Sequence, residues 1–81
     1  MKANIRITLK AGVLDPQGKA IEHALKSLGF ESVNEVRQGK YLEVELAESD
    51  EARAREQVDR ICRELLANTV IEKYAYEIVG S

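Results

Sequence analysis

Two side chains in this 81-residue sequence, His23 and Cys62, belong to the types that most often act in nucleophilic or acid–base catalysis. His23 is the only histidine and lies on a predicted helix away from the apolar stripe, so we interpret it as a solvated or interface residue. Cys62 falls within the apolar stripe of a second predicted helix, where cysteine packs as a small hydrophobic residue. One histidine and one cysteine do not make a zinc site. We therefore expect no catalytic, cofactor-binding or metal-binding residue in this chain.

Carboxylates are abundant, but their pattern is that of a charged surface. Fourteen Asp and Glu side chains against twelve Lys and Arg give a formal net charge of −2. Glu43 and Glu45 share one strand face, where an ion pair with Arg6 would contribute ~1 kcal/mol at most. RNA-binding sheets stack bases on aromatic residues in a basic field, which does not fit an acidic chain with two glutamates beside Tyr41. We expect no matched acid–base pair and no nucleic-acid partner.

Residues 13–18 carry the clearest local signals. Asp15 is suited to cap a helix by accepting hydrogen bonds from the first turn, and Pro16 suits the first helical position. Gly18 follows one turn later, where glycine costs roughly 1 kcal/mol relative to alanine, so we expect its bare backbone to serve a close neighbour or a partner. A helix N-terminus can hold an anion, but Asp15 would repel it. We interpret the stretch as a helix start shaped for packing.

Hydrophobic periodicity predicts the element order β-α-β-β-α-β. Strands are predicted at residues 3–10, 32–38, 40–47 and 70–79, and helices at residues 16–28 and from the caps at 48–51 to about 67. The apolar stripes expected to face the core are Ala20, Ile21, Ala24, Leu25 and Leu28 in the first helix, and Val58, Ile61, Cys62, Leu65 and Leu66 in the second. Val33 and Val36 fall on opposite faces of the second strand, which makes it the weakest of the four.

Small and polar residues mark the ends of these elements. Gly29 and Asn68 suit left-handed positions just past the two helices. Gln38 and Gly39 form a plausible tight turn in which the glycine supplies a positive φ, so that an antiparallel hairpin results. With right-handed crossovers, this order predicts an α+β, ferredoxin-like βαββαβ sandwich, in which two helices cover one face of a four-stranded antiparallel sheet. The other face, with Arg6, Thr8, Tyr41, Glu43 and Glu45, is left bare and is a candidate for pairing.

The chain as a whole has the bulk properties of one small domain over residues 1–81. A chain of this length buries only about 60% of its unfolded surface, so self-association would help to stabilise it. A single cysteine forms no internal disulfide, charged residues interrupt the apolar positions of residues 1–10, and no apolar run approaches about 18 residues. We expect a cytoplasmic protein that binds no membrane.

Several segments carry a resemblance that spans essentially the whole chain. They are residues 9–18 (LKAGVLDPQG), 28–30 (LGF), 36–40 (VRQGK), 65–68 (LLAN) and 70–74 (VIEKY). Together they resemble the PurS family, the small subunits of bacterial and archaeal phosphoribosylformylglycinamidine (FGAM) synthase. Thr69 departs from the family pattern, which usually has proline after the asparagine.

The resemblance implies a non-catalytic subunit of a glutamine- and ATP-dependent ligase in de novo purine biosynthesis. Such a subunit would form a homodimer or homotetramer, bridge a PurQ-like glutaminase and a PurL-like synthetase, and support ammonia transfer between them. ATP, magnesium and glutamine would be used by those partners, with no cofactor bound by this chain. The residues implied as partner contacts are Asp15, Pro16, Gln17, Gly18, Arg37, Gly39, Lys40 and Asn68.

Each of these residues also has a purely structural interpretation as a cap or turn residue. A second hypothesis, from a different functional class, is a free-standing ferredoxin-like sensor of small molecules that dimerises through its open sheet face.

Overall fold

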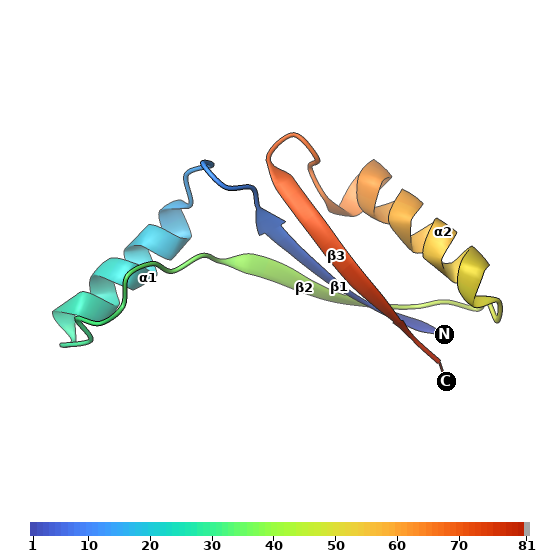
Figure 1. The fold of residues 1–81 in the computed structure, drawn as a ribbon, viewed down its shortest axis with the longest axis horizontal. Helices are drawn as coiled ribbons and strands as arrows, with labels where there is room; N and C mark the ends of the chain where they lie inside the picture. The colour runs from blue at the N-terminus through green and yellow to red at the C-terminus, as the bar shows by residue number, and fades with distance from the viewer. Residues whose placement is uncertain (81) are drawn as a thin grey trace.

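The computed structural model describes residues 1–80, which contain three strands and two α-helices (Figure 1). The elements are β1 (Lys2–Leu9), α1 (Pro16–Ser27), β2 (Gly39–Glu45), α2 (Glu51–Ile61), the π-helical turn η1 (Cys62–Leu66) and β3 (Glu72–Val79). The strands form one antiparallel sheet in the order β2-β1-β3. The predicted α+β class, with two helices and an antiparallel sheet, is confirmed. Within residues 1–80 neither helix is long and apolar enough to cross a membrane.

The core lies between the sheet and α2. Ala3, Ile5 and Ile7 alternate along β1 and are buried on the face that α2 covers. Ile5 lies opposite Leu42 of β2 and Tyr76 of β3, so the central strand is flanked by apolar side chains on both sides. Because α2 supplies the buried residue Val58 and η1 supplies the buried residue Cys62, part of the second predicted apolar stripe does belong to the core.

The opposite face of the sheet is open, as predicted, and carries several charged side chains. Arg6 lies 5.9 Å from the centre of the Tyr41 ring, and Lys2 forms an ion pair with Glu43 at 2.6 Å. Tyr41 is 55% exposed. This face is therefore a charged surface with one cation–π pair rather than a continuous apolar patch.

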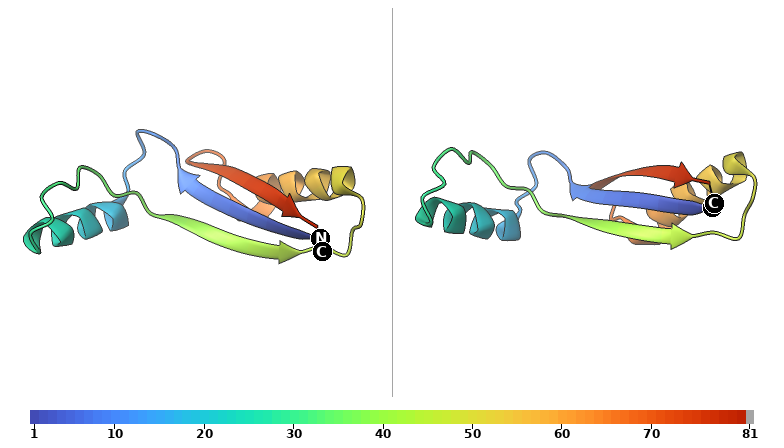
Figure 2. Two further views of the ribbon diagram at one scale, coloured as in Figure 1. Left: turned by 60° about the horizontal axis from the view of Figure 1, so that its bottom comes forward. Right: turned by 90° about the horizontal axis from the view of Figure 1, so that it is seen from below.

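The position of α1 differs from the prediction. Figures 1 and 2 show α1 beyond the ends of the strands rather than on the sheet. Its apolar stripe is consequently uncovered, with Ile21 42% and Leu28 74% exposed, and Phe30, just beyond the helix, is 55% exposed. The prediction that both helices cover one face is wrong within the chain, although the helix itself and its amphipathic pattern are present.

Residues 32–38 also differ from the prediction. They run without regular structure from the end of α1 to the start of β2 and pair with no strand among residues 1–80. Their two valines, Val33 and Val36, are half-buried, and the N–H of Gln38 donates to a side chain, Asp15, instead of to a strand. The sheet of the described residues thus has three strands, not four.

Two of the predicted turn residues behave differently from each other. Gly29 has a φ of +98°, and the N–H groups of Gly29 and Phe30 donate to the carbonyl oxygens of Lys26 and Leu25, which confirms the predicted Schellman ending of α1. Gly39 does not have a positive φ, because it is the first residue of β2 rather than a turn residue. A Cβ at Gly39 would lie 2.8 Å from the side chain of Thr8 on β1, so the glycine permits close strand approach.

The end of the second helix is wider than an α-helix. The N–H of Ala67 donates to the carbonyl oxygen of Cys62 at 2.9 Å, the spacing of a π-helical turn. Leu65 is 79% exposed, so its predicted place in the core stripe is wrong. Asn68 does not adopt the predicted left-handed backbone conformation. Its side-chain oxygen instead accepts a hydrogen bond from the N–H of Val70 at 3.2 Å.

Candidate functional site

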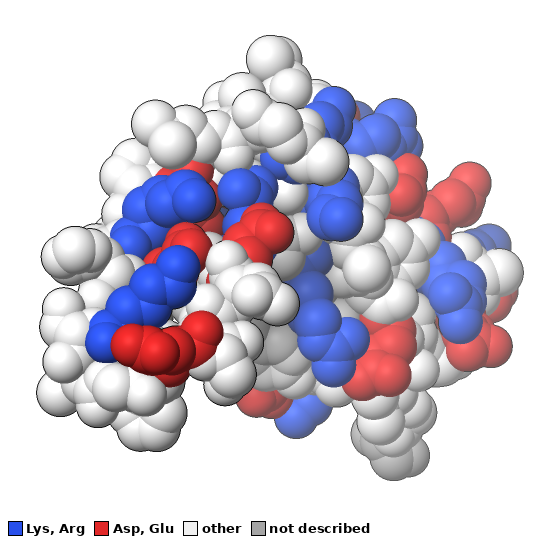
Figure 3. Space-filling view, turned by 60° about the vertical axis from the view of Figure 1, so that its left-hand side comes forward, with Lys and Arg blue, Asp and Glu red and all other residues white. Residues whose placement is uncertain are grey.

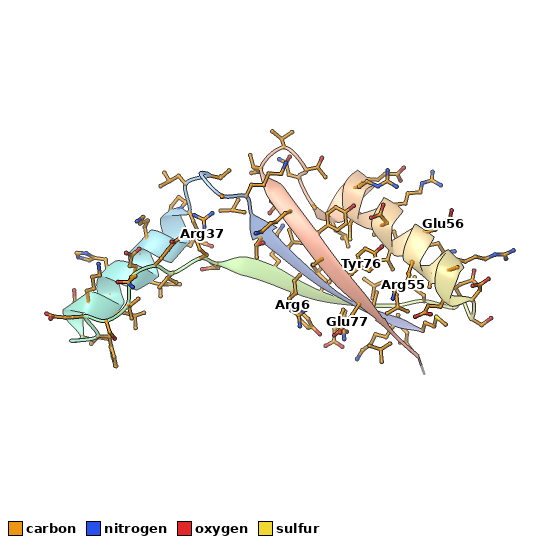
Figure 4. The ribbon with its side chains drawn as sticks, in the orientation of Figure 1. Arg6, Arg37, Arg55, Glu56, Tyr76 and Glu77 are labelled. Carbon is orange, nitrogen blue, oxygen red and sulfur yellow. The ribbon has the colours of Figure 1, made fainter. Side chains whose placement is uncertain are left out.

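The eight residues implied as partner contacts lie at one end of the sheet, where β1 ends and β2 and β3 begin. Three chain segments meet there, namely residues 10–18, 36–40 and 68–72. We call this region the junction. In Figure 4 Arg37 lies between α1 and the start of β2, which marks the centre of the junction.

Asp15 holds two of these segments together. Its Oδ1 accepts a hydrogen bond from the N–H of Gly18 at 2.8 Å, and its Oδ2 accepts one from the N–H of Gln38 at 2.7 Å. These two donors, Gln38 first, hold the pKa of Asp15 below its ordinary value. The predicted helix cap is confirmed, and the same carboxylate also fixes the start of β2 relative to α1.

Gly18 is required by a neighbour in the same chain. A Cβ at this position would lie well inside van der Waals distance of the carbonyl oxygen of Val36 and 2.8 Å from Oδ2 of Asp15. The residues 32–38 therefore pass against the first turn of α1 with no room for a side chain. Of the two alternatives left by the sequence, a close neighbour or a partner, the structure supplies the neighbour.

We expect Gly18→Ala to lower the free energy of unfolding, although alanine favours a helix by roughly 1 kcal/mol. The added methyl group meets backbone, which yields less readily than a side chain, and overpacking of this kind costs about 1–3 kcal/mol. Urea unfolding measures the effect. Gly80→Ala is the matched control, because nothing lies within 4 Å of a Cβ there. A Gly18→Ala protein more stable than the parent would show that the Val36 approach is not constraining.

Arg37 fixes the loop that leads into α1. Its Nη1 donates to the carbonyl oxygen of Val13 at 3.0 Å, and its Nη2 donates to that of Lys10 at 3.2 Å. A neighbouring pair of side chains adds a further tie, since Nε2 of Gln38 donates to Oε1 of Gln17 at 2.6 Å. The guanidinium therefore has a structural role within the chain, because it holds the loop before α1 against the segment before β2.

Lys40 and Asn68 are linked through a glutamate that the sequence did not single out. Oε1 of Glu72 accepts a hydrogen bond from the N–H of Asn68 at 2.7 Å, and Oε2 lies 3.7 Å from Nζ of Lys40. The Glu72 side chain is only 14% exposed, whereas that of Lys40 is 60% exposed. No spacing rule identifies Glu72, because its role depends on β2 and β3 beginning at the same end of the sheet.

A shallow hollow of about 380 Å³ opens at the junction. Its lining combines apolar residues from the end of β1 with polar residues of the junction, and consists of Ile7, Leu9, Asp15, Pro16, Gln17, Gln38, Gly39, Lys40 and Glu72. Figure 3 shows Lys and Arg interleaved with Asp and Glu over this side of the molecule, without one dominant sign. An apolar floor with a mixed polar rim is suited to binding another molecule.

The two residues considered first for catalysis lie apart from the junction. Cys62 is fully buried under the sheet, and burial raises the pKa of its thiol, which disfavours the nucleophilic thiolate. His23 is exposed on α1 beside Lys19, Glu22 and Lys26. Within the described residues, no three His, Cys, Asp or Glu side chains gather as a metal site would require.

The fold and the junction define a small α+β domain whose ordered polar groups hold backbone segments together and whose exposed groups surround an open hollow. The family model for PurS, described as phosphoribosylformylglycinamidine (FGAM) synthase, matches residues 2–80. The chain therefore belongs to the PurS family.

Relatives and solved structures agree with this assignment. A PurS subunit of phosphoribosylformylglycinamidine synthase from Synechocystis sp. is 51% identical over 76 residues, which cover 94% of this chain and 76% of the relative. The corresponding Bacillus subtilis subunit is 47% identical over 95% of this chain and 90% of its own length. The crystal structure of Methanocaldococcus jannaschii PurS matches with a TM-score of 0.88, at 40% identity over 99% of this chain and 96% of that chain. A chain in the structure of PurLQS from Thermotoga maritima matches with a TM-score of 0.77, at 32% identity over 96% of this chain and 95% of that one.

Proposed function

We propose that this chain is a subunit of FGAM synthase in purine biosynthesis and that it acts through assembly rather than catalysis. The observation that carries the proposal is the family match, which extends over residues 2–80 and includes every segment of the junction. The junction fits this function because its charged groups are engaged in holding backbone segments together, as Asp15 and Arg37 illustrate.

The proposed partners are a PurL-like synthetase and a PurQ-like glutaminase, together with further copies of this chain. The PurLQS complex of Thermotoga maritima contains a chain of the same fold, which supports this set of partners. In such a complex the glutaminase releases ammonia from glutamine, and the synthetase uses ATP and magnesium to introduce it into the amidine. This chain would bridge the two enzymes and support the transfer of ammonia, without binding a cofactor itself.

The junction is the proposed contact surface for these enzymes. All of its proposed contact residues except Asp15 and Gly18 are exposed, and of these Pro16, Gln17 and Lys40 would touch a partner directly. The five other members, Asp15, Gly18, Arg37, Gly39 and Asn68, would act by shaping the backbone that presents them.

Three further properties belong to the same proposal. The chain would act as one domain over residues 1–81 and would work in the cytoplasm, where the purine pathway of its relatives suggests that it operates. A fourth strand would be added to the sheet only in the assembly, because residues 32–38 pair with no strand among residues 1–80 and any strand neighbour would come from another chain. The sensor hypothesis has no observation in its favour.

Reconstitution tests the function. Purified synthetase and glutaminase subunits are assayed with and without this chain, using glutamine and then ammonium chloride as the nitrogen source. We expect omission of the chain to abolish glutamine-dependent amidine formation and to spare ammonium-dependent formation, because free ammonia bypasses the glutaminase. Equal glutamine-dependent rates with and without the chain would contradict the proposal.

Within the same assay, Lys40→Ala is expected to weaken assembly several-fold and to make it less sensitive to salt, because an exposed rim charge acts through long-range attraction. The measurement is the concentration of this chain that gives half-maximal glutamine-dependent activity. Arg60→Ala on α2 is the control, since it also removes an exposed cation from an ion pair with a glutamate but lies away from the junction. Equal effects of the two changes would exclude a specific contact by Lys40.

A further inference from the structure

A second hollow, of about 480 Å³, opens at the same end of the sheet as the junction but on the open face. Thr8 lies opposite Lys73 in the register of β1 and β3, and it points away from the side to which its buried neighbour Ile7 points. The polar residues of the lining are Thr8, Glu35, Arg37 and Lys73. We call this region the Thr8 hollow, and its volume lies in the range of small-ligand sites.

The cations near the Thr8 hollow are poorly neutralised within the chain. Three of the twelve Lys and Arg residues lie within 4 Å of no carboxylate among residues 1–80, namely Arg6, Lys10 and Lys73. Lys73 lines the hollow, and Arg6 lies two residues before Thr8 on the same face of β1. Figure 4 shows Arg6 on the side of the sheet away from α2. A local excess of positive charge therefore borders this hollow, in a chain whose formal net charge is −2.

Arg37 brings a further cation to the hollow, and this cation is held in a fixed position. Its two Nη atoms donate to the carbonyl oxygens of Val13 and Lys10, while a guanidinium carries five N–H groups in all, so further donors stay free for another acceptor. Glu35 supplies a carboxylate oxygen 3.8 Å from Nε of Arg37, but its side chain is 64% exposed, so solvent screens much of its charge. The Thr8 hydroxyl adds a neutral donor. The donors around the hollow thus come from three separate segments of the chain.

We propose that the Thr8 hollow binds the phosphate group of a small phosphate monoester. The Arg37 guanidinium and the Lys73 ammonium donate charge-assisted hydrogen bonds, and the Thr8 hydroxyl donates a third. A phosphate group has three strong acceptor oxygens, which suit donors from three segments. A carboxylate is instead matched by a single arginine fork, and both Nη atoms of Arg37 already donate to backbone. The site uses neither the junction hollow nor a partner enzyme, so it stands apart from the proposed function.

Titration of the isotope-labelled chain with glycerol phosphate tests the site, with amide chemical shifts measured by NMR spectroscopy. We expect saturable shifts at roughly millimolar concentration, and these shifts should weaken as salt is added. They should be largest at residues of the hollow such as Thr8, Gly12 and Lys73, and small at Lys2. Glycerol is the control for the uncharged part of the ligand. Shifts that never saturate, or equal shifts with glycerol, would overturn the proposal.

A polyglutamate peptide is the second arm of the same titration, because an acidic segment of a protein could also meet these cations. Saturable shifts at the Thr8 hollow with polyglutamate but not with glycerol phosphate would overturn the proposal in favour of a protein ligand. Binding of glycerol phosphate combined with failed reconstitution of glutamine-dependent activity would retain the phosphate site and reject the synthase function.

Two substitutions should move the affinity for glycerol phosphate in opposite directions. Lys73→Ala removes a cation from the hollow and should weaken binding about tenfold. Glu35→Gln removes the neighbouring carboxylate and should strengthen binding several-fold, a gain that a loss of structure would not produce. Lys2→Ala is the matched control, because it removes an exposed lysine from the same sheet face at the other end of β1, and it should change the affinity little. An unchanged affinity of Lys73→Ala, or an equal loss in Lys2→Ala, would overturn the assignment of the site.

Discussion

Replacing Ile5 with alanine is expected to lower the free energy of unfolding by about 2–5 kcal/mol, the largest effect of any single change considered for this chain. Ile5 is fully buried at the centre of β1, opposite Leu42 and Tyr76, where the neighbouring strands limit collapse of the resulting cavity. Because small domains have only about 5–15 kcal/mol of stability, this loss would remove much of it.

Urea unfolding at one fixed protein concentration measures the effect, since self-association contributes to apparent stability. Ile71→Ala is the matched control, because the same side chain is removed from a position that is 38% exposed. Ile71→Ala should cost distinctly less. Similar losses for the two variants would show that the core is not centred on β1.

Replacing Asp15 with asparagine is expected to destabilise the chain more than the same change at Asp50. Both residues cap a helix, and asparagine caps as well as aspartate. Asp15, however, accepts from Gly18 with one oxygen and from Gln38 with the other, whereas Asp50 caps through Oδ1 alone, from Ala52. An amide has one accepting oxygen, so Asp15→Asn leaves one backbone donor unpaired at the junction. Urea unfolding at pH 7 compares the two variants.

The effect of Asp15→Asn should also depend on pH. Hydrogen bonds from Gln38 and Gly18 lower the pKa of Asp15 from its ordinary value of 3.8, so the folded state favours the ionised form. The stabilisation is therefore fully present above about pH 5 and is lost as the pH falls through the lowered pKa. The difference in unfolding free energy between the parent and Asp15→Asn should shrink over this acidic range. A difference that stays constant down to the lowest accessible pH would contradict the assigned role of the carboxylate.

The sequence predicted the elements whose signals are local. Alternation along β1 and β3, the Asp15 cap, Pro16 at the first helical position and the Schellman ending at Gly29 all depend on residues within one or two turns of each other. The eight residues proposed as partner contacts were also selected from short motifs, and they lie together at the junction, while their role as contacts stays a prediction.

The features that the sequence missed depend on distant parts of the chain. The exposed position of α1 follows from bonds between residues 10–15 and 37–38, and amphipathicity specifies that a face is covered without specifying what covers it. Gly39 was predicted to supply a positive φ in a turn, but it is dictated by the close approach of β1. For Gly18 the sequence predicted a close neighbour or a partner, and only the structure identifies that neighbour as Val36. Glu72 has no motif at all, because its importance arises from the ion pair with Lys40 across the sheet end.

The described ends of the chain lie side by side, because Lys2 of β1 faces Val79 of β3. Figure 1 shows both ends at the side of the molecule opposite α1, in a structure whose longest dimension is 49 Å. For protein engineering, this means that the two ends are close enough to be joined. A fluorophore or fusion attached at either end would report on assembly at the junction without obstructing it, and a short peptide joining the ends would preserve the strand order of the sheet.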